Sequence, residues 1–205
     1  MTAIALGFRV KSGYAVAVAV RGPASAPTCV ARRIVELCDP AVAQTRQPYH
    51  AELHAHEQDP GALARRIAIV TRCANQSIAA LLNTDVFAEA GCGGAALVVG
   101  SVIDPASVAN PHIRAHASEG ALFRDVLRDA LRARGLRCDV FTEKQLAASA
   151  TASLQRRESV IKRVVAEFGK TAGAPWRAEE KAASTAAWMM LPASRLDSAT
   201  SRRES

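Results

Sequence analysis

The chain has 205 residues, of which 49% are hydrophobic and 4% aromatic, so its core consists mainly of Ala, Val, Leu and Ile. This length and composition are typical of one α/β domain. The five cysteines form no C-x-x-C pair, which disfavours a zinc ribbon or a disulfide framework and indicates reduced thiols in a cytoplasmic protein. No apolar run reaches the roughly 18 residues of a membrane span, so we expect neither a membrane partner nor a signal peptide.

The chain is basic, because 26 Lys and Arg against 19 Asp and Glu give a formal net charge of +7. A positive surface attracts phosphate groups, which makes nucleic acid a candidate partner. An Arg-rich composition gives the same charge without any nucleic acid being involved. Both interpretations stay open at this point.

Three consecutive strands open the chain. The first, Ile4–Val10, ends at the turn signal Lys11-Ser12-Gly13. Strict alternation of Ala and Val in Tyr14–Arg21 predicts a central strand with one small face and one β-branched face. Two adjacent arginines within the apolar segment Cys29–Leu37 favour an outer strand, since charged side chains discourage pairing at a sheet edge.

Helices and strands alternate in the rest of the chain. Two apolar segments separated by a helix, Ala95–Gly100 and Cys138–Thr142, predict parallel strands. The predicted helices are Gly61–Leu82, His112–Arg134, Glu143–Ala148, Leu154–Phe168 and Trp176–Leu191. We therefore expect a mixed five-stranded sheet with helices on both faces, formed by a single domain over residues 1–191, and a disordered polar tail over 192–205.

This order of elements is that of the ribonuclease H-like fold, and four segments resemble the Holliday-junction resolvases of the RuvC type. Gly7–Val16 resembles the family's opening, in which a glycine, a hydrophobic residue and Asp-Pro-Gly precede Gly-Tyr-Ala or a similar segment. Asn110–Ala121 resembles the segment after the family's fourth strand, and Val140–Leu146 resembles the fifth strand and its turn. Trp176–Met190 lies where the family has an Ala-rich final helix with paired acidic residues.

The resemblance implies a nuclease for branched DNA that holds two Mg²⁺ or Mn²⁺ ions with four carboxylates. Carried over to this chain, the first-strand Asp matches Arg9, and the fourth-strand Glu matches Gly100, or Ser101 if the register slips by one. Only the final helix keeps acids, Glu179 and Glu180. A cation at the metal position and a missing ligand argue against such a nuclease, so we expect a pseudoenzyme without a metal cofactor.

We predict that Arg9 replaces the metals electrostatically and pairs with Glu179 or Glu180, which would hold the final helix against the sheet. A solvated arginine at a strand end is the alternative. Asp104 completes this candidate degenerate site, because strand C-termini line the crevice of open α/β sheets. An Asp-Pro turn is the favoured interpretation of that residue.

A histidine cluster makes His50, His54 and His56 weak candidates for a zinc site, since imidazoles at i and i+4 can share a helical face. A polar surface loop with one histidine hydrogen-bonded in place is the favoured alternative. His112 and His116 follow a predicted helix N-terminus, where they could contact phosphate or be solvent-exposed. The candidate nucleic-acid contacts are the basic residues Lys11, Arg114, Arg156, Arg157, Lys162 and Arg163.

These features predict a non-catalytic, RuvC-related protein that binds DNA, RNA or a protein partner. One alternative is a metal-dependent nuclease for branched DNA, which requires at least three acids at one sheet edge. A nucleic-acid binder requires a continuous positive surface there. The other alternative is a structural or assembly protein, acting for instance as a homodimer, which requires an exposed apolar patch.

Overall fold

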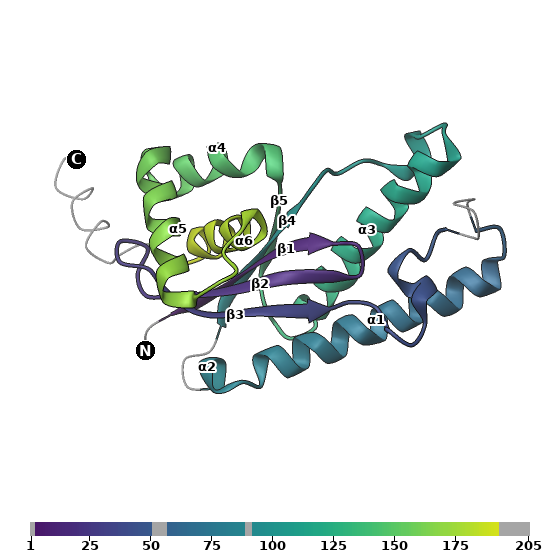
Figure 1. Ribbon diagram of the computed structural model, residues 1–205, viewed down its shortest axis with the longest axis horizontal. Coiled ribbons are helices and arrows are strands. Elements are labelled where there is room, and N and C mark those ends of the chain that lie inside the picture. The colour runs from purple at the N-terminus through teal and green to yellow at the C-terminus, as the bar shows by residue number, and fades with distance from the viewer. Residues whose placement is uncertain (1–2, 51–56, 89–91, 193–205) are drawn as a thin grey trace.

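The computed structural model describes residues 3–50, 57–88 and 92–192 (Figure 1). The strands are β1 (Ile4–Lys11), β2 (Tyr14–Arg21), β3 (Thr28–Glu36), β4 (Cys92–Val99) and β5 (Cys138–Thr142). The helices are α1 (Pro60–Leu82), α2 (Asp85–Ala88), α3 (Pro111–Arg132), α4 (Glu143–Leu154), α5 (Glu158–Ala172) and α6 (Ala178–Met189). Residues 193–205 of the predicted tail, which was expected over 192–205, lie outside the described part. Among the described helices, none is long and apolar enough to cross a membrane.

The five strands form one sheet in the order β3-β2-β1-β4-β5, with β3 at an edge as predicted. The first three strands form an antiparallel meander, and β4 and β5 run parallel to β1. The predicted mixed five-stranded sheet is therefore confirmed. Because β1, β4 and β5 are parallel, their C-terminal ends meet at the same edge.

Helices cover both faces of the sheet (Figure 1). Leu6 and Phe8 of β1 belong to the core beneath α1 and α3, whereas Ala5 belongs to the core beneath α4, α5 and α6. Successive side chains of a strand point to opposite faces, so Gly7 and Arg9 face the same side as Ala5. The strict Ala/Val alternation of β2 follows the same division, with its alanines mostly toward α1 and its valines toward α6.

Gly7 allows α6 to lie directly on β1. A methyl group at this position would overlap the carbonyl oxygen of Ala183 and lie 2.6 Å from the backbone nitrogen of Ala187. A glycine is needed where two backbones approach this closely. The close approach places the first turn of α6, with Glu179 and Glu180, beside the C-terminal end of β1.

The predicted boundaries around α4 and α5 are wrong. The first predicted helix, Glu143–Ala148, continues to Leu154 and ends at Gln155, which adopts a left-handed conformation with φ 50°. The second was expected over Leu154–Phe168, but α5 starts at Glu158. The spacing of apolar residues could not locate the break between α4 and α5, because the segments before and after it both have helical periodicity.

Candidate functional site

Arg9 and Glu143 lie at the sheet edge where β1, β4 and β5 end. Arg9 is paired in register with Val98 of β4, and Glu143 is the first residue of α4, directly after β5. The helix begins here because the side chain of Thr142 accepts a hydrogen bond from the backbone N–H of Gln145, whose own side chain accepts from the N–H of Thr142. This capping box leaves Glu143 at the end of the strand.

Arg9 is only 5% exposed, and each of its three guanidinium nitrogens has a partner. Its Nε and Nη2 lie 3.0 Å and 2.8 Å from Oε1 of Glu143. Its Nη1 donates to the carbonyl of Val10 at 2.6 Å and lies 3.4 Å from that of Val98. Arg9 is therefore a buried part of the sheet edge, and the alternative of a solvated arginine is wrong.

The acids of α6 have other partners, so the predicted pairing of Arg9 with them is wrong. Glu179 Oε1 lies 3.4 Å from Nζ of Lys11, and Glu180 Oε1 lies 3.2 Å from Nη1 of Arg32. Glu180 also caps its own helix, because its Oε2 accepts from the backbone N–H of Arg177 at 2.8 Å. Lys11 and Arg32 therefore make the ionic contacts that tie α6 to the sheet.

The charges at this edge are balanced, with the cations Arg9 and Lys11 beside the carboxylates of Glu143 and Glu179. The pKa of Glu179 is lowered first by its own backbone N–H at the start of α6, and further by Lys11 and Arg9. Arg9 thus acts on Glu179 through space without contacting it. A balanced edge lacks the excess negative charge that a pair of divalent ions requires.

Gly100 follows β4, where the resemblance expects a carboxylate ligand. A Cβ atom at this position would lie 4.0 Å from Oε2 of Glu143, so the Glu143 carboxylate borders the space that a side chain at residue 100 would enter. The edge opens into a hollow of about 230 Å³ lined in part by Arg9, Lys11 and Gly120. Within the described ranges, no three acidic side chains come close enough there to share one ion.

Asp104 caps a single turn of 3₁₀-helix at Pro105–Ser107. Its Oδ1 accepts from the backbone N–H of Ala106 at 3.0 Å, and its carbonyl accepts from the hydroxyl of Ser107 at 2.7 Å. The turn interpretation is therefore confirmed. The carboxylate serves this turn, and none of the contacts of Arg9 described above involves it.

The candidate nucleic-acid contacts do not form one continuous surface. Arg114 lies at the start of α3, where its Nη2 donates to the carbonyl of Ala109 at 3.0 Å. The connection between α4 and α5, which contains Arg156, lies at the opposite end of the molecule from the start of α3 (Figure 1). The Arg156 guanidinium lies over the Trp188 ring, 5.9 Å from its centroid, and its Nη2 is 3.4 Å from the carbonyl oxygen of Ser25. Arg156 therefore has a structural role.

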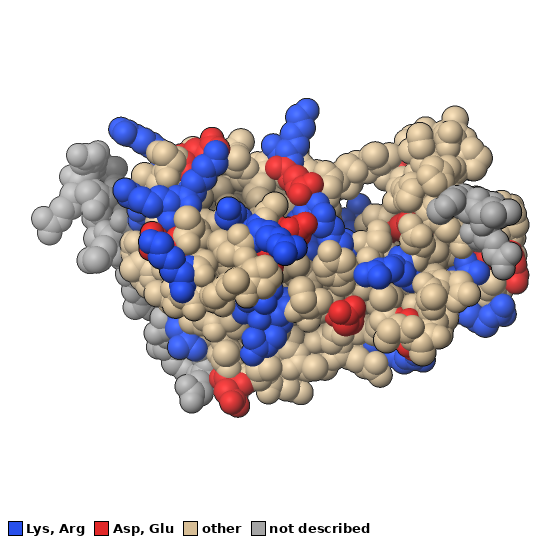
Figure 2. All heavy atoms as spheres, in the orientation of Figure 1, with Lys and Arg blue, Asp and Glu red and all other residues tan. Residues whose placement is uncertain are grey.

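Lys and Arg side chains gather over α5 and α6 in the view of Figure 2. We call the exposed cations of these two helices and their N-caps the basic face, which comprises Arg157, Lys162, Arg163, Lys170, Arg177 and Lys181. Lys162 pairs with Glu158 at 2.6 Å, and Lys170 pairs with Glu167 at 2.7 Å. By contrast, Arg157, Arg163, Arg177 and Lys181 form no ion pair with any described residue.

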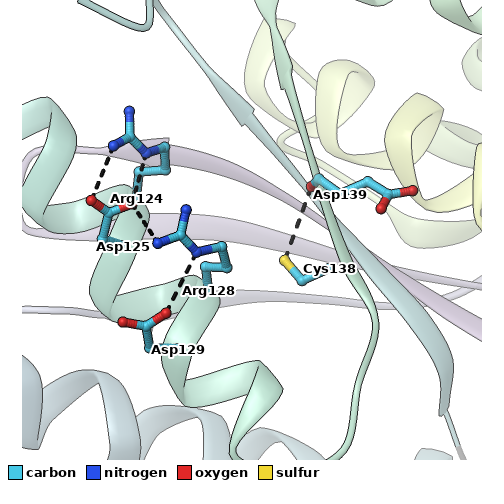
Figure 3. Close-up of polar contacts among 6 residues, drawn as sticks. All are labelled: Arg124, Asp125, Arg128, Asp129, Cys138 and Asp139. Carbon is cyan, nitrogen blue, oxygen red and sulfur yellow. Dashed lines mark hydrogen bonds and ion pairs between the residues drawn. The ribbon is translucent and has the colours of Figure 1, made fainter. Parts of the chain in front are cut away.

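The second half of α3 neutralises its own charges (Figure 3). Arg124 donates to both carboxylate oxygens of Asp125, at 2.8 Å and 3.0 Å. Arg128 lies 3.1 Å from Asp125 and 3.5 Å from Asp129. Arg124 and Arg128 are therefore both paired with acidic residues of their own helix.

The histidines predicted separately come together from two segments. His50 is buried, and its Nδ1 lies 2.7 Å from Oε1 of Glu119. Glu119 is a buried residue of α3 that no sequence pattern had pointed to. His112 and His116 of α3 lie against the His50 ring. The other two zinc candidates, residues 54 and 56, lie outside the described residues.

No model of a protein family matches the chain, and no curated protein sequence does. Among solved structures, Thermus thermophilus RuvC in complex with a Holliday junction substrate is similar, with 10% identity, a TM-score of 0.50 and 91% of each chain covered. Another RuvC structure from this organism has 9% identity, a TM-score of 0.48 and the same coverage. An Aquifex aeolicus Ppx/GppA family member has 14% identity and a TM-score of 0.35, covering 75% of this chain and 40% of its own. The similarity to the junction-bound RuvC and the strand order together show that this chain has the ribonuclease H-like fold.

Proposed function

We propose that this chain is a non-catalytic, RuvC-related protein that binds nucleic acid without cutting it. The observation that carries the proposal is the buried guanidinium of Arg9, held by Glu143, where the resemblance assigns the first metal-binding carboxylate. Two divalent ions about 4 Å apart need clustered carboxylates. Arginine stays protonated in proteins, so this edge opposes their binding.

The charge of the chain supports nucleic acid as the partner. The net charge is +7, and four cations of the basic face have no acidic partner among the described residues. Such side chains can neutralise phosphate charges, and this neutralisation supplies a large share of the affinity in nucleic-acid complexes. Branched DNA is the first ligand to test, because the similar RuvC structure was determined with a Holliday junction substrate.

The proposal is tested by fluorescence anisotropy with a four-way junction, a duplex and a single strand over a range of salt concentrations. We expect binding that weakens steeply with salt. The triple variant Arg157→Ala/Arg163→Ala/Lys181→Ala should bind about tenfold or more weakly. The slope of its log affinity against log salt concentration should become shallower, by an amount equivalent to the loss of up to about three phosphate contacts.

The matched control is Arg65→Ala/Arg72→Ala/Arg132→Ala, which removes the same charge from exposed positions on α1 and α3. We expect it to change the affinity by less than about threefold, through the weaker long-range field alone. Equal losses in both triple variants would contradict the assignment to the basic face. Absence of salt-sensitive binding to any of the three ligands would contradict nucleic acid as the partner.

Self-association is a second candidate function, favoured by three exposed apolar side chains near the start of α3. Val102 and Ile103 follow β4, and Ile113 lies in the first turn of α3. Exposed apolar groups of this kind mark interaction surfaces when they form a contiguous patch. Sedimentation velocity should then show a dimer that Ile113→Ser dissociates, and a monomer at all concentrations would exclude this role.

A further inference from the structure

Three imidazole rings meet where the segment before residue 51 packs against the first turns of α3. The ring centroids of His50 and His116 are 4.6 Å apart, those of His112 and His116 also 4.6 Å, and those of His50 and His112 5.4 Å. One nitrogen from each ring lies within 4.8 Å of the other two. His50 is buried, whereas the two histidines of α3 are exposed, so the group opens to solvent on one side.

Glu119 orients the His50 ring by a hydrogen bond and lies close to the His116 ring without one. Its side chain is 1% exposed, and its two oxygens face different histidines. Oε1 lies 2.7 Å from Nδ1 of His50, and Oε2 lies 3.5 Å from Nδ1 of His116. A carboxylate on Nδ1 fixes the tautomer that leaves Nε2 as an electron-pair donor, which is how outer carboxylates prepare histidines to bind metals.

His50 Nε2 is a buried polar atom without a hydrogen-bond partner in the described structure. Buried polar atoms are normally satisfied, so such an atom needs an explanation. The Glu119 carboxylate already engages the other nitrogen of this ring. A metal ion beside the two α3 histidines would satisfy Nε2.

The geometry of the α3 pair fits a tetrahedral ion. Nε2 of His112 and Nε2 of His116 are 3.2 Å apart. Zinc–nitrogen bonds of about 2.0–2.1 Å at tetrahedral angles place two ligand nitrogens about 3.3 Å apart. The existing separation thus already matches one edge of the coordination tetrahedron. The His50 nitrogen lies within 4.8 Å of the other two and would move closer to them to complete a face.

We propose that His50, His112 and His116 bind one divalent transition-metal ion, with Zn²⁺ the best match, and that Glu119 is the positioning carboxylate. Three neutral imidazoles select zinc, copper or nickel over Mg²⁺ or Ca²⁺, which prefer oxygen ligands. The fourth coordination position faces solvent and would hold water or an exchangeable ligand. This inference does not depend on nucleic-acid binding, because it uses none of the basic face.

The test is titration of the metal-free, full-length protein with Zn²⁺ against a chromophoric chelator, and with Co²⁺ by visible absorption. We expect one tight equivalent and the intense visible bands of four-coordinate Co²⁺. His112→Ala and His116→Ala change exposed side chains and should keep the circular dichroism of the native fold while weakening binding at least about 100-fold. Glu119→Gln should weaken it about 10–100-fold.

The matched control is His54→Ala/His56→Ala, which removes the two remaining histidines of the chain. It should keep the tight site and the Co²⁺ spectrum. Loss of binding in this control with retention in His112→Ala would overturn the proposal. So would the absence of tight Zn²⁺ or Co²⁺ binding to the wild-type protein, since the three rings would then form only a hydrogen-bonded cluster around Glu119.

Discussion

Arg9 and Glu143 are 134 positions apart in the sequence, and the Glu143 Oε1 atom accepts from both Nε and Nη2 of the Arg9 guanidinium. The topology makes this contact possible, because β1 and β5 are both parallel to the strand between them and end at the same edge. A buried cation therefore occupies the position where the resemblance expects the first metal ligand, and a half-exposed carboxylate lies beside it.

Removing the carboxylate should destabilise the fold, because it leaves the buried guanidinium without its anionic partner. We expect Glu143→Gln to lower the free energy of unfolding by about 1–2 kcal/mol, less than for a fully buried pair because the Glu143 side chain is 51% exposed. Urea denaturation measures the change. The matched control is Glu158→Gln, since Glu158 is 53% exposed and pairs with Lys162 along one helix, so its loss should cost less than about 0.5 kcal/mol.

The close packing of α6 on β1 makes Gly7 intolerant of a side chain. Gly7→Ala should lower the free energy of unfolding by about 3 kcal/mol or more, because its methyl group would overlap the backbone of α6. The control is Gly120→Ala in α3, where a Cβ would meet nothing within 4 Å and where alanine favours the helix by about 1 kcal/mol. Thermal unfolding of the two variants should therefore shift in opposite directions, and similar shifts would contradict the packing described.

The contribution of Glu179, which pairs with Lys11, to the stability of the fold should depend on pH. The pKa of Glu179 is lowered in the folded protein, so its ionised form stabilises the fold above the pKa of the unfolded chain. This stabilisation is lost as the pH falls through the folded-state pKa. Glu179→Gln should be less stable than the wild type at neutral pH, with a difference that shrinks in acid. A difference independent of pH would contradict this account, and Glu167→Gln on the outside of α5 serves as the control.

The two buried thiols should be unreactive in the native protein. Burial raises the pKa of Cys29 and of Cys138 to about 11, so the reactive thiolate is scarce at neutral pH. Labelling with a thiol-specific disulfide reagent should reach these two residues only at the rate of unfolding. Peptide mapping after a short pulse checks this, and rapid modification of either residue in the native state would be the contrary result.

The sequence alone predicted the fold more fully than the site. The Ala/Val alternation predicted that β2 is a central strand, and the two adjacent arginines predicted that β3 is an outer strand. Both predictions rest on local patterns, and the sheet has both strands in those positions. Glu143 could have been selected only by combining the strand order with the parallel direction of β5, because locally it is simply the first residue of a well-capped helix. His50 and Glu119 are 69 positions apart, and no local pattern connects them.

Single-turnover incubation of a labelled four-way junction with saturating protein, in Mg²⁺ or Mn²⁺ and in chelator, tests the central claim most directly. The account predicts a fully bound junction, verified by anisotropy in the same samples, that stays intact in all three conditions. Cleavage that requires Mg²⁺ or Mn²⁺ and disappears in Glu143→Gln or Glu179→Gln would show that these carboxylates hold a catalytic metal, and would contradict a binding protein whose metal site has been replaced by Arg9.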